Sequence, residues 1–169
     1  MNGLKDAVIR RDRGFTIVEL LIVIVVIAVL AAITVVAFSG IQQRALFSSY
    51  QSDIKLLDKA IKMYYAENGT YPYTGVTASC WTNQATGTGD FIAGLAPTYI
   101  SKVPSTPAHN GGNNYYAYCF SALGTNYKVI RLVVGGQTLP TIESSGNPNI
   151  DPTRPTRGWG YWSPGCSAC

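Results

Sequence analysis

The sequence predicts an α+β protein in which one long N-terminal helix packs on a small antiparallel sheet. Residues 15–38 form an almost unbroken apolar run, residues 50–64 carry apolar side chains at helical spacing, and residues 115–134 have the pattern of two strands around a turn. The chain has 169 residues. That length suffices for one small domain and an anchor.

The run from Phe15 to Phe38 is long enough to cross a bilayer, because about 20 apolar residues span the hydrocarbon core as a helix. It contains neither proline nor glycine. In lipid the backbone hydrogen bonds must close within the segment, so its many β-branched residues do not prevent a helix. Four bases precede the run and the next base is Arg44. We therefore expect the N-terminus in the cytoplasm and the C-terminal part outside.

A secretory signal peptide and a plain single-pass anchor are the alternative interpretations of this run. Its apolar core is too long for a signal peptide, and the small pair Ala31-Ala32 lies inside the core instead of after it. A plain anchor leaves Glu19 unexplained, because a carboxylate in hydrocarbon costs about 2.5–3.5 kcal/mol. A helix that must find a positively charged partner inside the membrane has a use for such a residue.

Residues 14–23, GFTIVELLIV, resemble the N-terminal signature of type IV pilins and pseudopilins. The resemblance implies that a prepilin peptidase removes the basic leader 1–14 by cleaving between Gly14 and Phe15, and that Phe15 is then N-methylated. It also implies that Glu19 neutralises the new terminal amine of a neighbouring subunit. Many pilins carry a proline and a glycine within this helix, whereas the first glycine after the run here is Gly40.

The same resemblance implies a type IV pilin-like fold and a structural subunit of a filament that serves adhesion, motility or DNA uptake. We expect a single-pass protein of the cytoplasmic membrane, surrounded by lipid, that becomes a homo-oligomeric cell-surface filament. The implied partners are the prepilin peptidase, an inner-membrane platform protein and an assembly ATPase. The alternative is a minor pilin or a type II secretion pseudopilin that acts as a tip or ligand-binding subunit.

Beyond the run, residues 39–68 are expected to continue the helix in amphipathic form. Apolar residues recur at spacings of four and three, which is typical of one buried helix face: Tyr50, Ile54, Leu57, Ile61 and Tyr64. Asn68-Gly69 is predicted to end the helix, and Pro72 prevents its resumption. Residues 64–72 also resemble the helix-ending motif of many pilins.

Residues 69–169 are expected to form a loop-rich antiparallel β head. The segments 115–120 and 126–134 predict a hairpin with a turn at 123–126. Residues 73–114 predict a long connecting loop with a short helix near 90–95. Residues 139–143 predict a further short strand. The tail is punctuated by proline and glycine.

Four cysteines lie beyond the apolar run: Cys80, Cys119, Cys166 and Cys169. An even number of cysteines in an oxidising exterior favours disulfides, and four cysteines allow three pairings. We favour Cys80–Cys119 with Cys166–Cys169. The last pair also has C-x-x-C spacing, but a single pair at the C-terminus with one histidine in the chain argues against a metal or redox site.

An enzyme is not expected. His109 lies in a Pro/Gly/Asn-rich loop, and the sequence has no phosphate-binding glycine loop, metal cluster or evident carboxylate pair, so we expect no cofactor and no metal. Pseudopilins often have an aspartate-rich calcium segment where this chain has STPAHN at 105–110, which lacks the acidic ligands that calcium prefers.

Nucleic-acid binding is possible but unsupported, because the formal net charge is only +4. Aromatic and basic residues near the C-terminus nevertheless have the chemistry to stack on bases or sugars. They are Arg154, Arg157, Trp159, Tyr161 and Trp162. The alternative is that these aromatic side chains only pack the tail onto the sheet.

Overall fold

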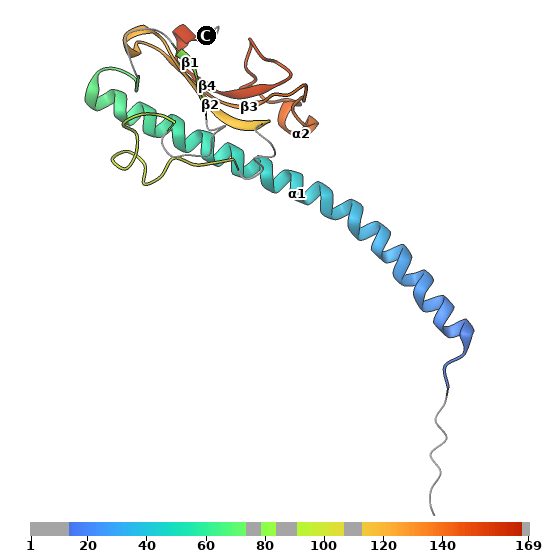
Figure 1. Cartoon of the computed structure of the whole chain (residues 1–169). Coiled ribbons are helices and arrows are strands. Elements are labelled where there is room, and N and C mark those ends of the chain that lie inside the picture. Colours follow the sequence, from blue (N-terminus) through green and yellow to red (C-terminus); the bar gives the residue numbers. More distant parts are fainter. Residues whose placement is uncertain (1–13, 74–78, 84–90, 107–112, 167–169) are drawn as a thin grey trace, which may run out of the picture. The chain divides into compact units, whose positions relative to one another are not determined.

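A computed structural model of the chain describes residues 14–73, 79–83, 91–106 and 113–166 (Figure 1). The chain divides into two compact units, Met1–Ile41 and Gln42–Cys169. One helix, α1, runs from Ile17 to Asn68 and contains 52 residues. The expected single long N-terminal helix is therefore confirmed.

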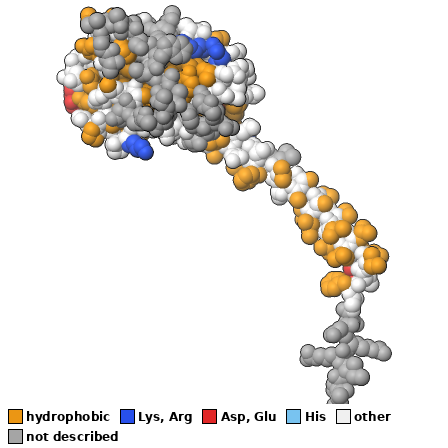
Figure 2. Space-filling view, in the orientation of Figure 1, with side chains coloured by type: hydrophobic (Ala, Val, Ile, Leu, Met, Phe, Trp, Pro, Cys, Tyr) orange, Lys and Arg blue, Asp and Glu red, His pale blue; other side chains and the backbone are white. Residues whose placement is uncertain are grey.

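The first part of α1 is apolar on all sides. Figure 2 shows hydrophobic side chains along this part of the helix, and the large ones that the structure describes from Ile17 to Val35 and from Phe38 to Ile41 are exposed in the isolated chain. Among the described residues, α1 is the one helix long and apolar enough to cross a membrane, judged by length and composition alone. A helix that is apolar all round needs either a protein core or lipid around it.

The helix ends where the sequence predicts. Gly69 adopts φ +71°, and its N–H donates to the carbonyl of Tyr65 at 2.9 Å. A glycine with left-handed backbone is the usual residue just after a helix, because it has no Cβ to clash there. Asn68 adds a side-chain bond from Nδ2 to the carbonyl of Tyr64 at 2.9 Å.

Four antiparallel strands form one sheet in the order β1-β2-β3-β4. Their bounds are Ser79–Asn83 for β1, Asn114–Phe120 for β2, Tyr127–Val133 for β3 and Gly158–Trp162 for β4. The predicted hairpin corresponds to β2 and β3, with Phe120 opposite Tyr127 and Tyr116 opposite Arg131. The 3-10 turns η2, Ala122–Gly124, and η3, Pro164–Cys166, follow β2 and β4.

Three expectations for the head were wrong or incomplete. Residues 139–143 do not form a strand but lead into a short helix, α2, Thr141–Ser144, because the carbonyl of Pro140 accepts the N–H groups of Glu143 and Ser144. The described residues of the expected 90–95 helix form turns, interrupted by Gly94 at φ +77°. The sequence also did not predict β1 or β4.

The core lies between the outer half of α1 and one face of the sheet. The predicted helical stripe is buried, with Tyr50, Ile54, Leu57 and Ile61 at most 3% exposed, and Tyr64 packs against it half-buried. Alternate residues of β2 and β3, including Tyr116, face this stripe. The opposite face of the sheet has a smaller apolar cluster, formed by Tyr115, Ala117, Ile130 and Leu132. Period-2 alternation along the strands explains the two faces.

Tyrosine hydroxyls of the sheet tie it to acidic residues of α1. Tyr116 Oη donates to Asp53 at 2.7 Å, and Tyr127 Oη donates to Asp58. Burial, and then the hydrogen bond to Asp53, raises the pKa of Tyr116 far above its ordinary value. These hydroxyls therefore remain protonated donors at all physiological pH values.

Strand β3 also carries two buried cations, which are paired by residues from the C-terminal third of the chain. Lys128 Nζ lies 3.1 Å from Asp151 Oδ1, and both side chains are fully buried. Arg131 Nη2 lies 3.3 Å from Glu143 Oε1, and Trp159 Nε1 donates to the other oxygen of Glu143 at 2.9 Å. Buried charges are tolerated only when they are paired and hydrogen-bonded in this way.

Candidate assembly site at the start of α1

Thr16 and Glu19 form a reciprocal cap at the first turn of α1. The backbone N–H and the hydroxyl of Thr16 donate to Glu19 Oε2 at 3.1 and 2.9 Å, and the N–H of Glu19 donates to Thr16 Oγ1 at 3.2 Å. A Thr-x-x-Glu pair in this arrangement is a capping box, which satisfies N–H groups that the helix itself leaves unbonded. The negative charge also complements the positive end of the helix dipole.

Glu19 is therefore held close to the point where the predicted mature chain begins. Gly14 and Phe15 precede the helix and are exposed, and no atom lies within 4 Å of the position that a Cβ on Gly14 would take. Both capping bonds use the same carboxylate oxygen, Oε2. In the part of the chain that the structure describes, Glu19 takes part in no ion pair.

The surroundings of this carboxylate are apolar. Phe15 and Ile17 are each 84% exposed, and exposed Leu and Val residues follow on every turn. The other two polar side chains of the run are satisfied locally: Thr16 by the cap, and Thr34 by donating to the carbonyl of Ala31 at 2.9 Å. Glu19 is thus the one charged group along this apolar surface.

The predicted cysteine sites lie elsewhere, in the unit Gln42–Cys169. Cys119 is buried in β2, and Cys166 is buried in η3 and disulfide-bonded. Cys80 is part of β1, but its side chain is outside the description, and Cys169 lies outside the described residues. The pairing Cys80–Cys119 with Cys166–Cys169 therefore stays a prediction.

His109 also lies outside the described residues, and the described ones contain no group of three potential metal ligands.

The C-terminal aromatic residues do not form one stacking platform. Trp159 is 2% exposed and packs edge-on against Phe47, so the packing interpretation is correct for it. Trp162 is half-buried, with Lys128 Nζ 5.5 Å from its ring centre, whereas Tyr161 is half-buried beside a hollow on the surface. Arg154 is engaged by Asp151 at 3.0 Å.

The sequence of the chain matches known proteins of one family. A family model described as the prokaryotic N-terminal methylation motif matches residues 9–35, which include Gly14, Phe15 and Glu19. The type II secretion system core protein G of Pectobacterium carotovorum subsp. carotovorum is 30% identical over 142 residues, covering 83% of this chain and 87% of that protein. The chain belongs to the type IV pilin and pseudopilin family.

Two other relatives show how the similarity is distributed. The core protein G of Aeromonas hydrophila is 32% identical over 101 residues, which cover 60% of this chain and 71% of that protein. The type IV major pilin protein PilA of Myxococcus xanthus is 39% identical over 61 residues, which cover 36% of this chain and 28% of that protein. No solved structure matches the chain significantly.

Family membership confirms two predictions from the sequence. The protein is a structural subunit, not an enzyme, and its apolar helix indicates membrane anchoring before assembly. The sequence analysis singled out Glu19 but missed its bond to Thr16. The signal was present, because a threonine followed three residues later by a glutamate, directly before an apolar run, is the pattern of a capping box.

Proposed function

We propose that this chain is a structural subunit of a type IV pilus-like filament that assembles through the apolar half of α1. Cleavage between Gly14 and Phe15 removes the leader 1–14, and Phe15 is N-methylated. Residues 15–38 anchor the subunit in the membrane and later pack inside the filament, and 39–68 carry the outward-facing head, 69–169. The observation that carries this proposal is the single carboxylate in the first turn of α1, whose first part is otherwise apolar all round.

Glu19 is proposed to set the register between subunits. Moving an apolar helix from lipid into a bundle of similar helices brings little hydrophobic gain, so a specific polar contact decides where subunits join. The new amine on Phe15 supplies a positive charge for Glu19 of the next subunit. Such a pair is strongly attractive in a low dielectric, but desolvation offsets much of the gain. Its value lies in specifying one alignment more than in adding stability.

The cap described above keeps this carboxylate available. Thr16 occupies Oε2, so the second oxygen can accept the amine of a neighbour while the capping box stays closed. The cap also spares the monomer in lipid an unsatisfied carboxylate at its helix start. Both effects support a subunit that is stored in the membrane before it polymerises.

The substitution Glu19→Val tests the proposal. The variant is expected to insert into the membrane as well as the wild type, because it removes a charge from the apolar run, but to yield no filaments. Sheared filament fractions and a membrane blot measure the two steps. Thr34→Val is the matched control, since it removes a polar group from the same helix away from the first turn, and it is expected to assemble normally.

Two results would overturn the proposal. One is a normal filament yield from Glu19→Val. The other is a mature chain that begins anywhere other than Phe15 in mass spectrometry, because the terminal amine would then be misplaced relative to Glu19.

The topology and partners follow as part of the same proposal. A cytoplasmic N-terminus exposes the leader to a prepilin peptidase, in agreement with the four bases before the run and the lack of others before Arg44. An inner-membrane platform protein and an assembly ATPase then extract the subunit from the bilayer. A reporter enzyme fused after Cys169 tests the orientation, because it should be active only on the outer side of the cytoplasmic membrane.

A pseudopilin of a type II secretion system is the second candidate. The observation that favours it is the extent of the match, because the similarity to core protein G covers 83% of this chain whereas the similarity to the pilin covers 36%. Deleting the gene separates the two candidates. Loss of export of extracellular enzymes would indicate a secretion subunit, whereas loss of surface filaments would indicate a pilus subunit. Immunogold labelling then separates a major subunit, found along the filament, from a minor one, found at its tip.

A further inference from the structure

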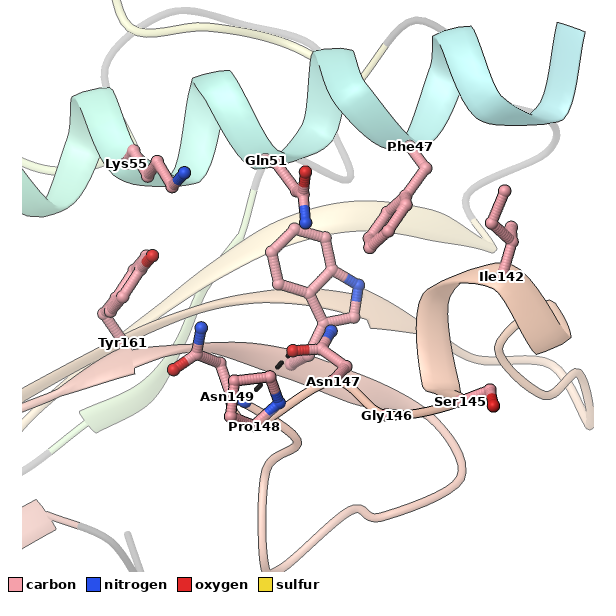
Figure 3. Close-up of a pocket in the computed structure, with 11 residues that line it drawn as sticks. Phe47, Gln51, Lys55, Ile142, Ser145, Gly146, Asn147, Pro148, Asn149 and Tyr161 are labelled. Carbon is pink, nitrogen blue, oxygen red and sulfur yellow. Dashed lines mark hydrogen bonds between the residues drawn. The ribbon is translucent and has the colours of Figure 1, made fainter. Parts of the chain in front are cut away.

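A hollow of about 260 Å³ opens between α1, the loop before β4 and β4 itself. Phe47, Gln51 and Lys55 line it from one side of α1, spaced four residues apart so that they share one helix face. Figure 3 shows Phe47 and Gln51 directed from the helix towards the sheet and Lys55 lying along the helix, with Tyr161 and Asn149 on the opposite wall. All of these residues belong to the unit Gln42–Cys169. We call this hollow the Gln51 pocket.

One wall of the Gln51 pocket is fixed by its own hydrogen bonds. Asn147 Nδ2 donates to the carbonyl of Glu143 at 2.9 Å, and Asn147 Oδ1 accepts the N–H of Asn149 at 3.0 Å. The carbonyl of Asn149 accepts the N–H of Gly160 at 2.9 Å, which ties the loop to β4. The backbone that carries the Asn149 side chain is therefore held in place before any ligand binds.

Three other polar side chains that line the hollow are, in contrast, unused. Within the described part of the chain, the side-chain amides of Gln51 and Asn149 and the ammonium of Lys55 make no hydrogen bond or ion pair. Each amide offers donors and an acceptor, and the ammonium offers three donors. Lys55 is the one charged residue among those that line the pocket.

We propose that the Gln51 pocket binds a single acidic sugar unit of the uronate type within a polysaccharide. Paired amides match adjacent sugar hydroxyls, which both donate and accept, and the ring faces of Tyr161 and Phe47 offer apolar surface to the C–H face of a sugar. The ammonium of Lys55 pairs with the sugar carboxylate. Lys55 and Ser145 are exposed, so the polymer can continue beyond the bound unit.

The same features argue against a nucleic acid. One cation cannot neutralise a run of phosphates, which nucleic-acid sites meet with several Lys and Arg residues. The most buried aromatic residue of the wall, Trp159, is 2% exposed and packed against Phe47, so no flat indole face is open to stack on a base. This site lies outside residues 15–38, through which assembly is proposed, and goes beyond the function proposed above.

Titration calorimetry of the full-length chain in detergent micelles tests the proposal. The probes are trigalacturonate and its methyl ester, which has the same sugars without the negative charges. We expect saturable binding of both, with the acid bound about fivefold more tightly, as one partly exposed ion pair allows. Lys55→Gln should abolish this preference and leave binding of the ester unchanged, and Gln51→Ala should weaken both probes.

Lys59→Gln is the matched control, because Lys59 is an exposed lysine one turn further along α1 that does not line the pocket. It should leave binding of both probes unchanged, and tryptophan fluorescence should show that every variant is folded. Absence of saturable binding of either probe overturns the proposal. Equal weakening by Lys55→Gln and Lys59→Gln also overturns it, since the attraction would then be non-specific. A third result would also overturn the proposal: the wild type binds no sugar, and Gln51→Ala forms no filaments. The pocket would then be assigned to contact with a neighbouring subunit.

Discussion

The substitution Asp151→Asn should destabilise the head more than any surface change, because Asp151 is the carboxylate that Lys128 meets inside the protein. Both side chains are 0% exposed, and the Nζ–Oδ1 distance is 3.1 Å. Asp151 also accepts from Arg154 Nη1 at 3.0 Å and from the N–H and hydroxyl of Thr153 at 3.0 and 2.8 Å. Asparagine keeps the shape but replaces one acceptor oxygen by a donor and removes the charge.

Removing one partner of a buried pair costs about 3–5 kcal/mol, because the remaining charge stays buried without its counter-charge. Urea unfolding of the full chain in micelles, followed by tryptophan fluorescence, measures the loss. With a slope of about 2 kcal/mol per M, the midpoint should fall by roughly 2 M. The control is Lys62→Met, which removes the 59% exposed partner of Asp58, 2.8 Å away, and should cost about 0.2–1 kcal/mol. An Asp151→Asn cost no larger than the control would refute the reasoning.

Acid pH should reveal the same interaction. Burial alone raises the pKa of Asp151, but hydrogen bonds from Thr153, Lys128 and Arg154 outweigh burial and hold that pKa below the ordinary value of 3.8. A carboxyl group whose pKa is lower in the folded state contributes stability that is fully present above its unfolded pKa and is lost as pH falls through the folded pKa. The difference in unfolding free energy between wild type and Asp151→Asn should therefore shrink below about pH 4, near the unfolded pKa of aspartate.

Two further substitutions test how the sheet is held. Tyr127→Phe should cost about 1–3 kcal/mol of unfolding free energy, because it removes the buried hydroxyl that donates to Asp58. Tyr99→Phe is the control, since it removes an exposed hydroxyl, and it should cost less. Equal losses from the two variants would contradict a stabilising role for the Tyr127–Asp58 hydrogen bond. Gly160→Ala should abolish the folded head in circular dichroism, since the added Cβ would clash with the carbonyl oxygen of Val129. Gly40→Ala is the control, because no atom lies within 4 Å of the Cβ that it adds. It should leave the head intact and favour the helix by about 1 kcal/mol. A folded head in Gly160→Ala would contradict the predicted clash.

The sequence predicted the parts of the fold that depend on periodicity. The stripe from Tyr50 to Ile61 and the stop at Gly69 are local signals, and the structure confirms both. Strand β4 escaped prediction because glycine has low strand propensity. Gly160 is nevertheless required, since only a residue without a side chain fits against Val129 in β3. That requirement comes from a partner strand about 30 residues away, which a local pattern cannot show.

The same distinction holds for the sites. Glu19 was predicted because its charge contradicts the hydropathy around it, and its bond to Thr16 follows a spacing rule that the sequence already contains. The Gln51 pocket follows no such rule. The spacing of Phe47, Gln51 and Lys55 places them on one helix face, but nothing in the sequence tells that a loop from residues 145–149 closes the other side.

The two buried cations of β3 make completion of the head depend on the end of the chain. Lys128 and Arg131 receive their counter-charges from Asp151 and Glu143, which follow them in the sequence. A nascent or truncated chain that stops before residue 143 lacks both counter-charges, so burying Lys128 or Arg131 would then leave a charge without its ion-pair partner. A finished head therefore requires the chain up to Asp151, because a shortened copy would lack the carboxylates that neutralise its central strand.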